Sequence, residues 1–397
     1  MRFLRTASTS RLMASIGGVV VAIAVCAAVA VAATSGGPVP KREPLAKAVH
    51  QALSAKSVSG VTARINFTNN LISSGEFQGS DPLLQGGSGR MWLSSAGHML
   101  RLEVQGENGD AQAVLRGQRF WAYDPSSNTV YEGTLPSQSA HPSAHRSKGL
   151  PSVANIQSEL TRVMQHAILS GAIPGDIAGQ PAYSVRVSPR QHGGLLGSIQ
   201  LGWDALHGVP LRVAVFARGD STPVLQLIAT NISYGSVPAS AFAVSPPKGA
   251  KVVQLSSTSA RNSSSKRTRG AAGVAAVQRA LPFKLDAPTR LAGMGRSEVK
   301  LVHMGSRPAA LLTYGQGLGG IAVLEAVSTG HSAPGSSAQG SGEGQGLTPP
   351  SVSVNGTTGQ ELDTALGSVI GFTRNHVAYT VLGSVTPAVA RAAARGL

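Results

Sequence analysis

The sequence predicts a mainly β fold of the α+β class, arranged as two successive sheet-rich domains. Short strand-like segments recur along most of the 397 residues, and turn signals rich in Gly, Asn, Asp and Pro separate them. Apolar residues at helical spacing occur in only a few segments. Hydrophobic residues make up 42% of the chain, which is enough to bury a core and excludes wholesale disorder.

The N-terminus has the pattern of an export signal. Residues 1–11 form a basic n-region without an acid, and residues 12–33 follow as the one uncharged apolar run of membrane-spanning length. The length of this run favours a retained transmembrane anchor, whereas Ala30-Val31-Ala32 has the small residues of a signal-peptide cleavage site. Both interpretations stay open, and both place the rest of the chain outside the cytoplasm, in the periplasm or beyond.

A large domain is expected over residues 44–255. It begins with an amphipathic helix that follows Pro44. Residues 58–135 alternate strand-like segments with turn signals and predict an antiparallel meander. A polar loop at 136–151 precedes a second predicted helix at 153–169, and further strand-like segments follow it.

A smaller domain is expected over residues 281–397. The preceding residues 256–280 are rich in Ser, Ala and Arg and predict a flexible basic linker. Strand-like segments then recur, and a Gly/Ser/Pro tract at 330–351 predicts a disordered insertion between two of them. Thr386 followed by Pro387 predicts the start of a C-terminal helix.

Motifs for catalysis and metal binding are weak. The G-x-G-x-x-G match at 315–320 precedes a strand-like segment, whereas a dinucleotide site needs a helix there, so it predicts a hairpin turn. His141 and His145 lie in a polar loop without a nearby acid, and Cys26, the single cysteine, lies in the export segment. No G-x-S-x-G elbow is present. We therefore expect a non-catalytic protein without a cofactor or metal, and an unrecognised hydrolase is the remaining alternative.

The net charge of +16 is concentrated around the linker, because basic residues greatly outnumber acids over 248–300. No aromatic residue lies in 248–282 to stack on bases, so a nucleic-acid partner is not expected. An anionic membrane surface is the expected partner of this tract, with Lys266, Arg267 and Arg269 as the candidate contacts. The alternative is a linker whose charges are simply solvated.

Several strand-like segments of the large domain, such as 211–216, are apolar on both faces. Such a sheet must cover both faces or leave one as an apolar ligand pocket. For each candidate, ordinary core packing is the alternative. The candidate pocket residues are Trp92, Leu100, Leu102, Trp121, Ile199, Leu201, Trp203 and Phe216.

Segments of both domains resemble the LolA-like superfamily. The phrases at 90–93, 123–125 and 208–212 carry the resemblance in the large domain, and 371–385 resembles the second domain of RseB/MucB-type sigma-E factor regulators. The resemblance implies a LolA-like half-open antiparallel β-barrel with helices, followed by a smaller antiparallel β domain with a C-terminal helix. It also implies that the ligand is the acyl chain of a lipid or lipoprotein and, in the RseB line, that the partner is a membrane anti-sigma factor.

We therefore expect an outward-facing lipid or lipoprotein sensor of the RseB type, either anchored by its N-terminal segment or secreted after cleavage. One alternative is a LolA-like lipoprotein carrier, which requires release from the membrane. Another is an adhesive or structural module whose basic linker binds an anionic wall polymer or membrane surface.

Overall fold

The structure of the chain is a computed structural model. It describes residues 39–72, 86–95, 97–106, 109–135, 151–190, 193–255, 271–304, 307–328 and 349–397. No helix among these residues is long and apolar enough to cross a membrane. Several sequence predictions lie outside the described residues, namely the n-region, the apolar run at 12–33, Lys266, Arg267 and Arg269, and most of the predicted insertion.

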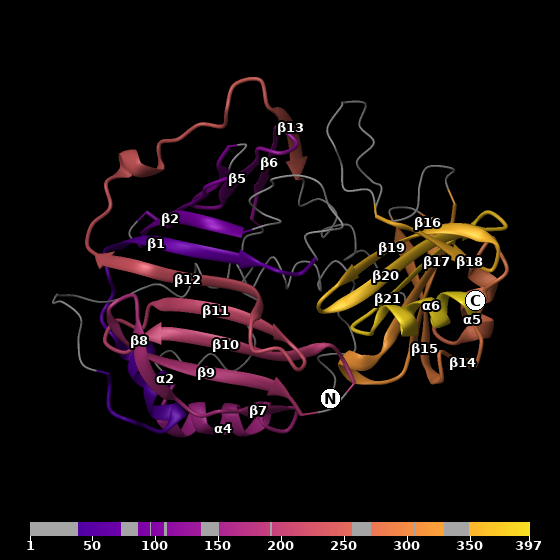
Figure 1. The fold of residues 1–397 in the computed structure, drawn as a ribbon, viewed down its shortest axis with the longest axis horizontal. Helices are drawn as coiled ribbons and strands as arrows, with labels where there is room; N and C mark the ends of the chain where they lie inside the picture. Colours follow the sequence, from indigo (N-terminus) through magenta and orange to yellow (C-terminus); the bar gives the residue numbers. More distant parts are fainter. Residues whose placement is uncertain are drawn as a thin grey trace.

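The described chain is mainly β and forms two sheets, as the sequence predicts (Figure 1). The first six strands of the large sheet are the predicted antiparallel meander, in which each strand pairs with the next. Their bounds are β1 Gly60–Asn69, β2 Gly86–Ser94, β3 Met99–Val104, β4 Ala111–Arg116, β5 Arg119–Asp124 and β6 Thr129–Thr134.

The second half of the large sheet returns to the first strand, because β12 pairs with β1. The sheet then curves from β13, which pairs in parallel with β6, to β7 at the other end (Figure 1). The remaining bounds are β7 Ala167–Leu169, β8 Ile173–Ile177, β9 Gln180–Pro189, β10 Leu196–Asp204, β11 Pro210–Ala217, β12 Pro223–Tyr234 and β13 Lys251–Leu255.

Two helices, α2 (Leu45–Ser54) and α4 (Val153–Val163), lie at the β7–β9 end of the sheet (Figure 1). The Ser152 side chain accepts a hydrogen bond from the Asn155 backbone N–H and so caps the start of α4. The predicted helix at 153–169 is too long, since its last residues form β7. Pairing of β7 with β9 satisfies backbone groups that a longer helix would have used internally.

The small sheet has the order β14-β15-β16-β17-β21-β20-β19-β18 and is antiparallel throughout. Its strands are β14 Arg290–Leu291, β15 Met294–Met304, β16 Arg307–Tyr314, β17 Ile321–Val327, β18 Ser351–Val354, β19 Thr357–Thr364, β20 Gly367–Arg374 and β21 Val377–Gly383. The predicted C-terminal helix is α6 (Pro387–Arg395), whose Ala390, Ala393 and Ala394 are buried in the core of this domain.

Part of the predicted linker belongs to the small domain. Residues Val274–Ala280 form the helix α5, and Val277 is fully buried in the core of the small sheet. Burial of this apolar residue stabilises the helix against the sheet, although the surrounding Ser/Ala/Arg composition is typical of a linker.

The G-x-G-x-x-G match lies in the turn between β16 and β17, as the hairpin prediction requires. It contains a short 3-10 helix, Gly317–Gly319, and is followed by a strand. This turn also meets the loop between β9 and β10 of the large domain, where a Cβ on Gly319 would lie 1.8 Å from the Gly193 carbonyl oxygen. Beside it, the Leu195 N–H donates to the Ser384 carbonyl oxygen at 3.2 Å, so the two domains are in direct contact.

Candidate functional site

One face of the large sheet carries an apolar strip that runs from β3 to β10. Residues directly opposite one another on neighbouring strands share a face. Leu102 on β3 pairs with Met91 on β2. On the other side of β1, Leu227 on β12 pairs with Val213 on β11, which in turn pairs with Leu201 on β10. Leu201 is 38% exposed and the other members are half-buried, so this face is only partly covered.

A groove with a cavity volume of about 90 Å³ follows this strip. This volume is below the roughly 300–1,000 Å³ of typical small-molecule pockets, so a long apolar ligand would lie along the strip with only part of its length enclosed. The groove is lined by Val61, Ile65, Met91, Leu93, Leu100, Leu102, Val209, Pro210, Leu211, Arg212, Val213, Leu227 and Ala229.

Five of the eight predicted pocket residues lie on this face. Leu100 and Leu102 line the groove itself. Ile199 and Leu201 extend the strip onto β10, where each is paired with a valine of β11. Trp203 lies at the end of the strip, with its ring centroid 6.1 Å from that of Tyr183.

The other three, Trp92, Trp121 and Phe216, lie on the opposite face, because side chains alternate along a strand. The guanidinium of Arg101 lies 4.8 Å from the Trp92 ring, and that of Arg186 lies 4.8 Å from the Phe216 ring. Phe216 is buried. These three rings therefore belong to a surface separate from the groove.

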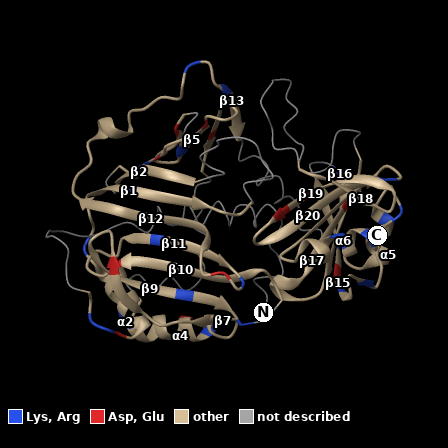
Figure 2. Ribbon diagram, in the orientation of Figure 1, with Lys and Arg blue, Asp and Glu red and all other residues tan. Residues whose placement is uncertain are grey.

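Arg186 on β9 and Arg212 on β11 are isolated arginines on otherwise uncharged strands (Figure 2). Strand alternation places both on the opposite face, and Arg212 also borders the groove. Burial lowers the pKa of the Arg212 guanidinium, and the charge of Arg186 lowers it further. The two faces of the sheet thus differ in chemistry, one apolar and one with embedded cations.

Sequence reasoning missed the groove residues Met91, Leu211, Val213 and Leu227. Alternation along each strand places them on one face, but the pairing of β12 with β1 is what brings the two halves together. These two strands are more than 150 positions apart in the chain, and no local pattern specifies their register.

A buried polar network closes the turn between β10 and β11. Asp204 is fully buried and accepts hydrogen bonds from the His207 N–H at 2.8 Å, from His207 Nδ1 at 2.9 Å and from the Tyr234 hydroxyl at 2.5 Å. Burial raises the pKa of the Tyr234 hydroxyl, and its hydrogen bond to Asp204 raises it further. These hydrogen bonds attach the turn between β10 and β11 to β12, on which Tyr234 lies.

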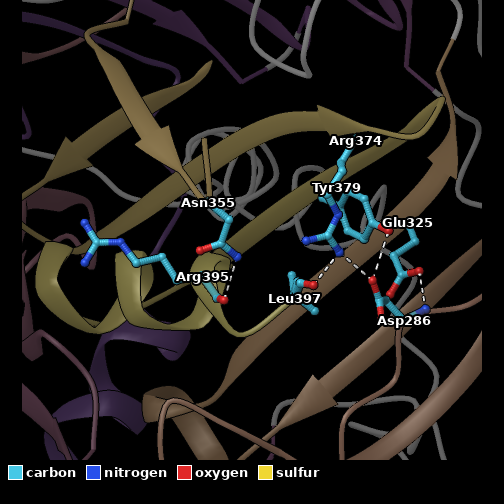
Figure 3. A network of polar contacts seen from close by, with 7 residues as sticks. All are labelled: Asp286, Glu325, Asn355, Arg374, Tyr379, Arg395 and Leu397. Atoms are coloured by element: carbon cyan, nitrogen blue, oxygen red, sulfur yellow. Dashed lines mark hydrogen bonds and ion pairs between the residues drawn. The ribbon is translucent and has the colours of Figure 1, made fainter. Parts of the chain in front are cut away.

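A second polar network lies in the small domain (Figure 3). The Arg374 guanidinium donates to the Asp286 carboxylate at 2.6 Å and also to the carbonyl oxygen of Leu397. The Tyr379 hydroxyl donates to the same carboxylate at 3.3 Å, and the Asp286 N–H donates to Glu325 Oε2 at 3.0 Å. The network attaches the segment before β14 and the C-terminal residue to the sheet.

Among the described residues, no group of three or more His, Cys, Asp or Glu side chains could hold a metal ion.

No family model matches the sequence, and no curated protein matches it. Among solved structures, the chain is similar to MucB in complex with MucA(peri), with 15% identity, a TM-score of 0.39, and coverage of 88% of this chain and 94% of that chain. The Pseudomonas aeruginosa MucA/MucB complex gives 15% identity, a TM-score of 0.38 and the same coverage.

A domain assigned to outer membrane lipoprotein sorting, from Vibrio parahaemolyticus, is 10% identical with a TM-score of 0.19, and covers 50% of this chain and 96% of that one. These are the kinds of protein that the sequence resemblance names. Because every TM-score is below 0.5, they carry no argument about the ligand or partner of this chain.

Proposed function

We propose that this chain is a non-catalytic, extracytoplasmic binding protein that takes the acyl chain of a lipid or lipoprotein along the apolar strip. The observation that supports the proposal is the strip itself, partly exposed apolar side chains on β2–β3 and on β10–β12 that share one face, with the buried Ala63 and Ile65 of β1 between them. A soluble protein rarely leaves a contiguous apolar surface of this kind without a binding role.

The expected affinity comes from burial of methylene groups. Each buried CH₂ contributes about 0.8 kcal/mol, so about ten methylenes along the strip are needed to supply the roughly 8 kcal/mol of micromolar affinity before any headgroup contact. No polar side chain is required for this step, and the paired members of the strip, Met91, Leu102, Leu201, Val213 and Leu227, are all uncharged.

The test is binding of a fluorescent palmitoylated peptide, followed by anisotropy, with native mass spectrometry of the purified chain as a second measurement. Leu102→Gln and Leu227→Gln, on opposite sides of the groove, are each expected to weaken binding about tenfold, because each places a polar amide against the ligand. Leu53→Gln on α2 is the matched control, since Leu53 is 48% exposed and does not line the groove.

Binding that both groove variants leave unchanged would refute the proposed site. A wild-type chain that carries no bound lipid mass and also fails to bind the palmitoylated peptide would refute the function.

A regulatory role, in which ligand binding controls a membrane anti-sigma factor, is part of the same proposal. It rests on the sequence resemblance and on the order of a large β domain followed by a smaller one, and it names the periplasmic part of a membrane anti-sigma factor as the partner. Cross-linking in the host, followed by identification of the bound protein, tests it. Recovery of an anti-sigma factor only in the absence of acylated ligand is the result expected of a sensor.

A further inference from the structure

Two arginines lie directly opposite each other at the end of the β4–β5 hairpin. Arg116 pairs with Arg119 across the turn, so both side chains leave the same face of the sheet. Like charges in such a pair destabilise a hairpin unless an anion lies between them. Among the described residues, no carboxylate forms an ion pair with either guanidinium.

The arginines border a cavity of about 780 Å³. Strands β4–β6 and the end of β13 line the cavity together with residues 244–246. Its volume is within the roughly 300–1,000 Å³ typical of small-molecule sites. Trp121, Val114 and Val244 supply apolar lining. The acid that lines the cavity, Glu132, accepts a hydrogen bond from Gln254 Nε2 at 2.8 Å.

One of the two guanidinium groups is held in place. Arg116 donates to the carbonyl oxygen of Phe242, a fully buried residue of the 3-10 helix Ala239–Phe242. The same helix is fixed to β3, because Arg101 Nη1 donates to the Ala241 carbonyl oxygen at 2.8 Å. Arg116 is therefore pre-positioned at the mouth of the cavity, while the exposed Arg119 is free to adjust to a ligand.

We propose that this cavity binds the phosphate monoester group of a ligand whose apolar part lies against Trp121. A phosphate monoester carries a charge of about −1.5 to −2 near neutral pH, which matches two guanidinium groups, and its oxygens accept bidentate hydrogen bonds from each. Arginine is the side chain suited to this geometry. The site is distinct from the apolar strip. Leu115 pairs with Leu100 and so lies on the groove face, whereas the side chain of the next residue, Arg116, projects from the opposite face.

The experiment is isothermal titration of the full chain with phenyl phosphate, inorganic phosphate and benzoate, and a flotation assay with phosphatidic acid vesicles. We expect phenyl phosphate to bind, Arg119→Gln to weaken it about tenfold and Arg119→Lys to restore only part of the affinity. Arg218→Gln is the matched control, since Arg218 is an exposed arginine that does not line the cavity. Circular dichroism of each variant checks that the sheet is intact.

The probes separate the sources of the phosphate. If inorganic phosphate binds as tightly as phenyl phosphate and Arg119→Gln weakens both equally, the result would support a site for free phosphate. If only the vesicles bind, and Arg119→Gln weakens that binding, the result would support a lipid headgroup. Benzoate bound as tightly as phenyl phosphate would overturn the assignment to phosphate. Absence of binding to every probe, or binding that Arg119→Gln leaves unchanged, would overturn the site.

Discussion

The stability of the small domain is expected to fall as the pH rises, because Glu325 is buried in its core. This side chain is fully buried on β17, between Ala310 and Tyr379 of the neighbouring strands. Burial raises the pKa of the Glu325 carboxyl to about 8; its hydrogen bond from the Asp286 N–H lowers it, and the nearby Asp286 carboxylate raises it. Glu325 is therefore a neutral acid at neutral pH.

The sign follows from proton linkage. In the unfolded chain the Glu325 carboxyl has its ordinary pKa of 4.5. Between pH 4.5 and about pH 8, the folded state therefore holds a proton that the unfolded state has lost. The stabilisation is fully present below the lower value and is lost as the pH rises through the higher one. At about 1.4 kcal/mol per pH unit, the whole loss is about 5 kcal/mol, of which about 4 kcal/mol falls between pH 5 and pH 8.5.

The assay is amide hydrogen exchange of β17 peptides in the wild type and in Glu325→Gln, compared at each of these two pH values. Glutamine is isosteric with the neutral acid and does not titrate, so the variant is expected to gain about 4 kcal/mol over the wild type as the pH is raised. Glu298→Gln is the control, because Glu298 is 45% exposed and forms an ion pair with Lys300. A difference between wild type and Glu325→Gln that is the same at both pH values would refute the reasoning.

Two further predictions concern the turn network and the domain contact. Tyr234→Phe removes the hydroxyl that donates to the buried Asp204, and it is expected to lower the free energy of unfolding by about 1.5–3 kcal/mol in urea denaturation; no loss would mean that the bond is not stabilising. Gly319→Ala places a Cβ against the Gly193 carbonyl oxygen and is expected to accelerate amide exchange in the loop between β9 and β10. Gly175→Ala, which meets nothing within 4 Å, is the control, and equal exchange in both variants would contradict a tight domain contact.

The sequence by itself determined the fold class, the meander of β1–β6, the C-terminal helix and the turn nature of the glycine motif. These features depend on short-range signals, since period-two alternation, turn residues and a Pro at the first helical position act within a few residues. The same signals mark Leu100 and Leu102 as apolar strand residues that can line a groove.

Only the tertiary structure decided which of the apolar residues share a surface. The pairing of β1 with β12 places Met91 and Leu102 on the same face of one sheet as Val213 and Leu227. Strand alternation places Trp121 on the opposite face. Pairing of strands distant in sequence is selected by burial of whole faces, and a shift of one residue would turn every side chain to the other side. The groove exists because one register of β1 against β12 was selected among many that local sequence permits.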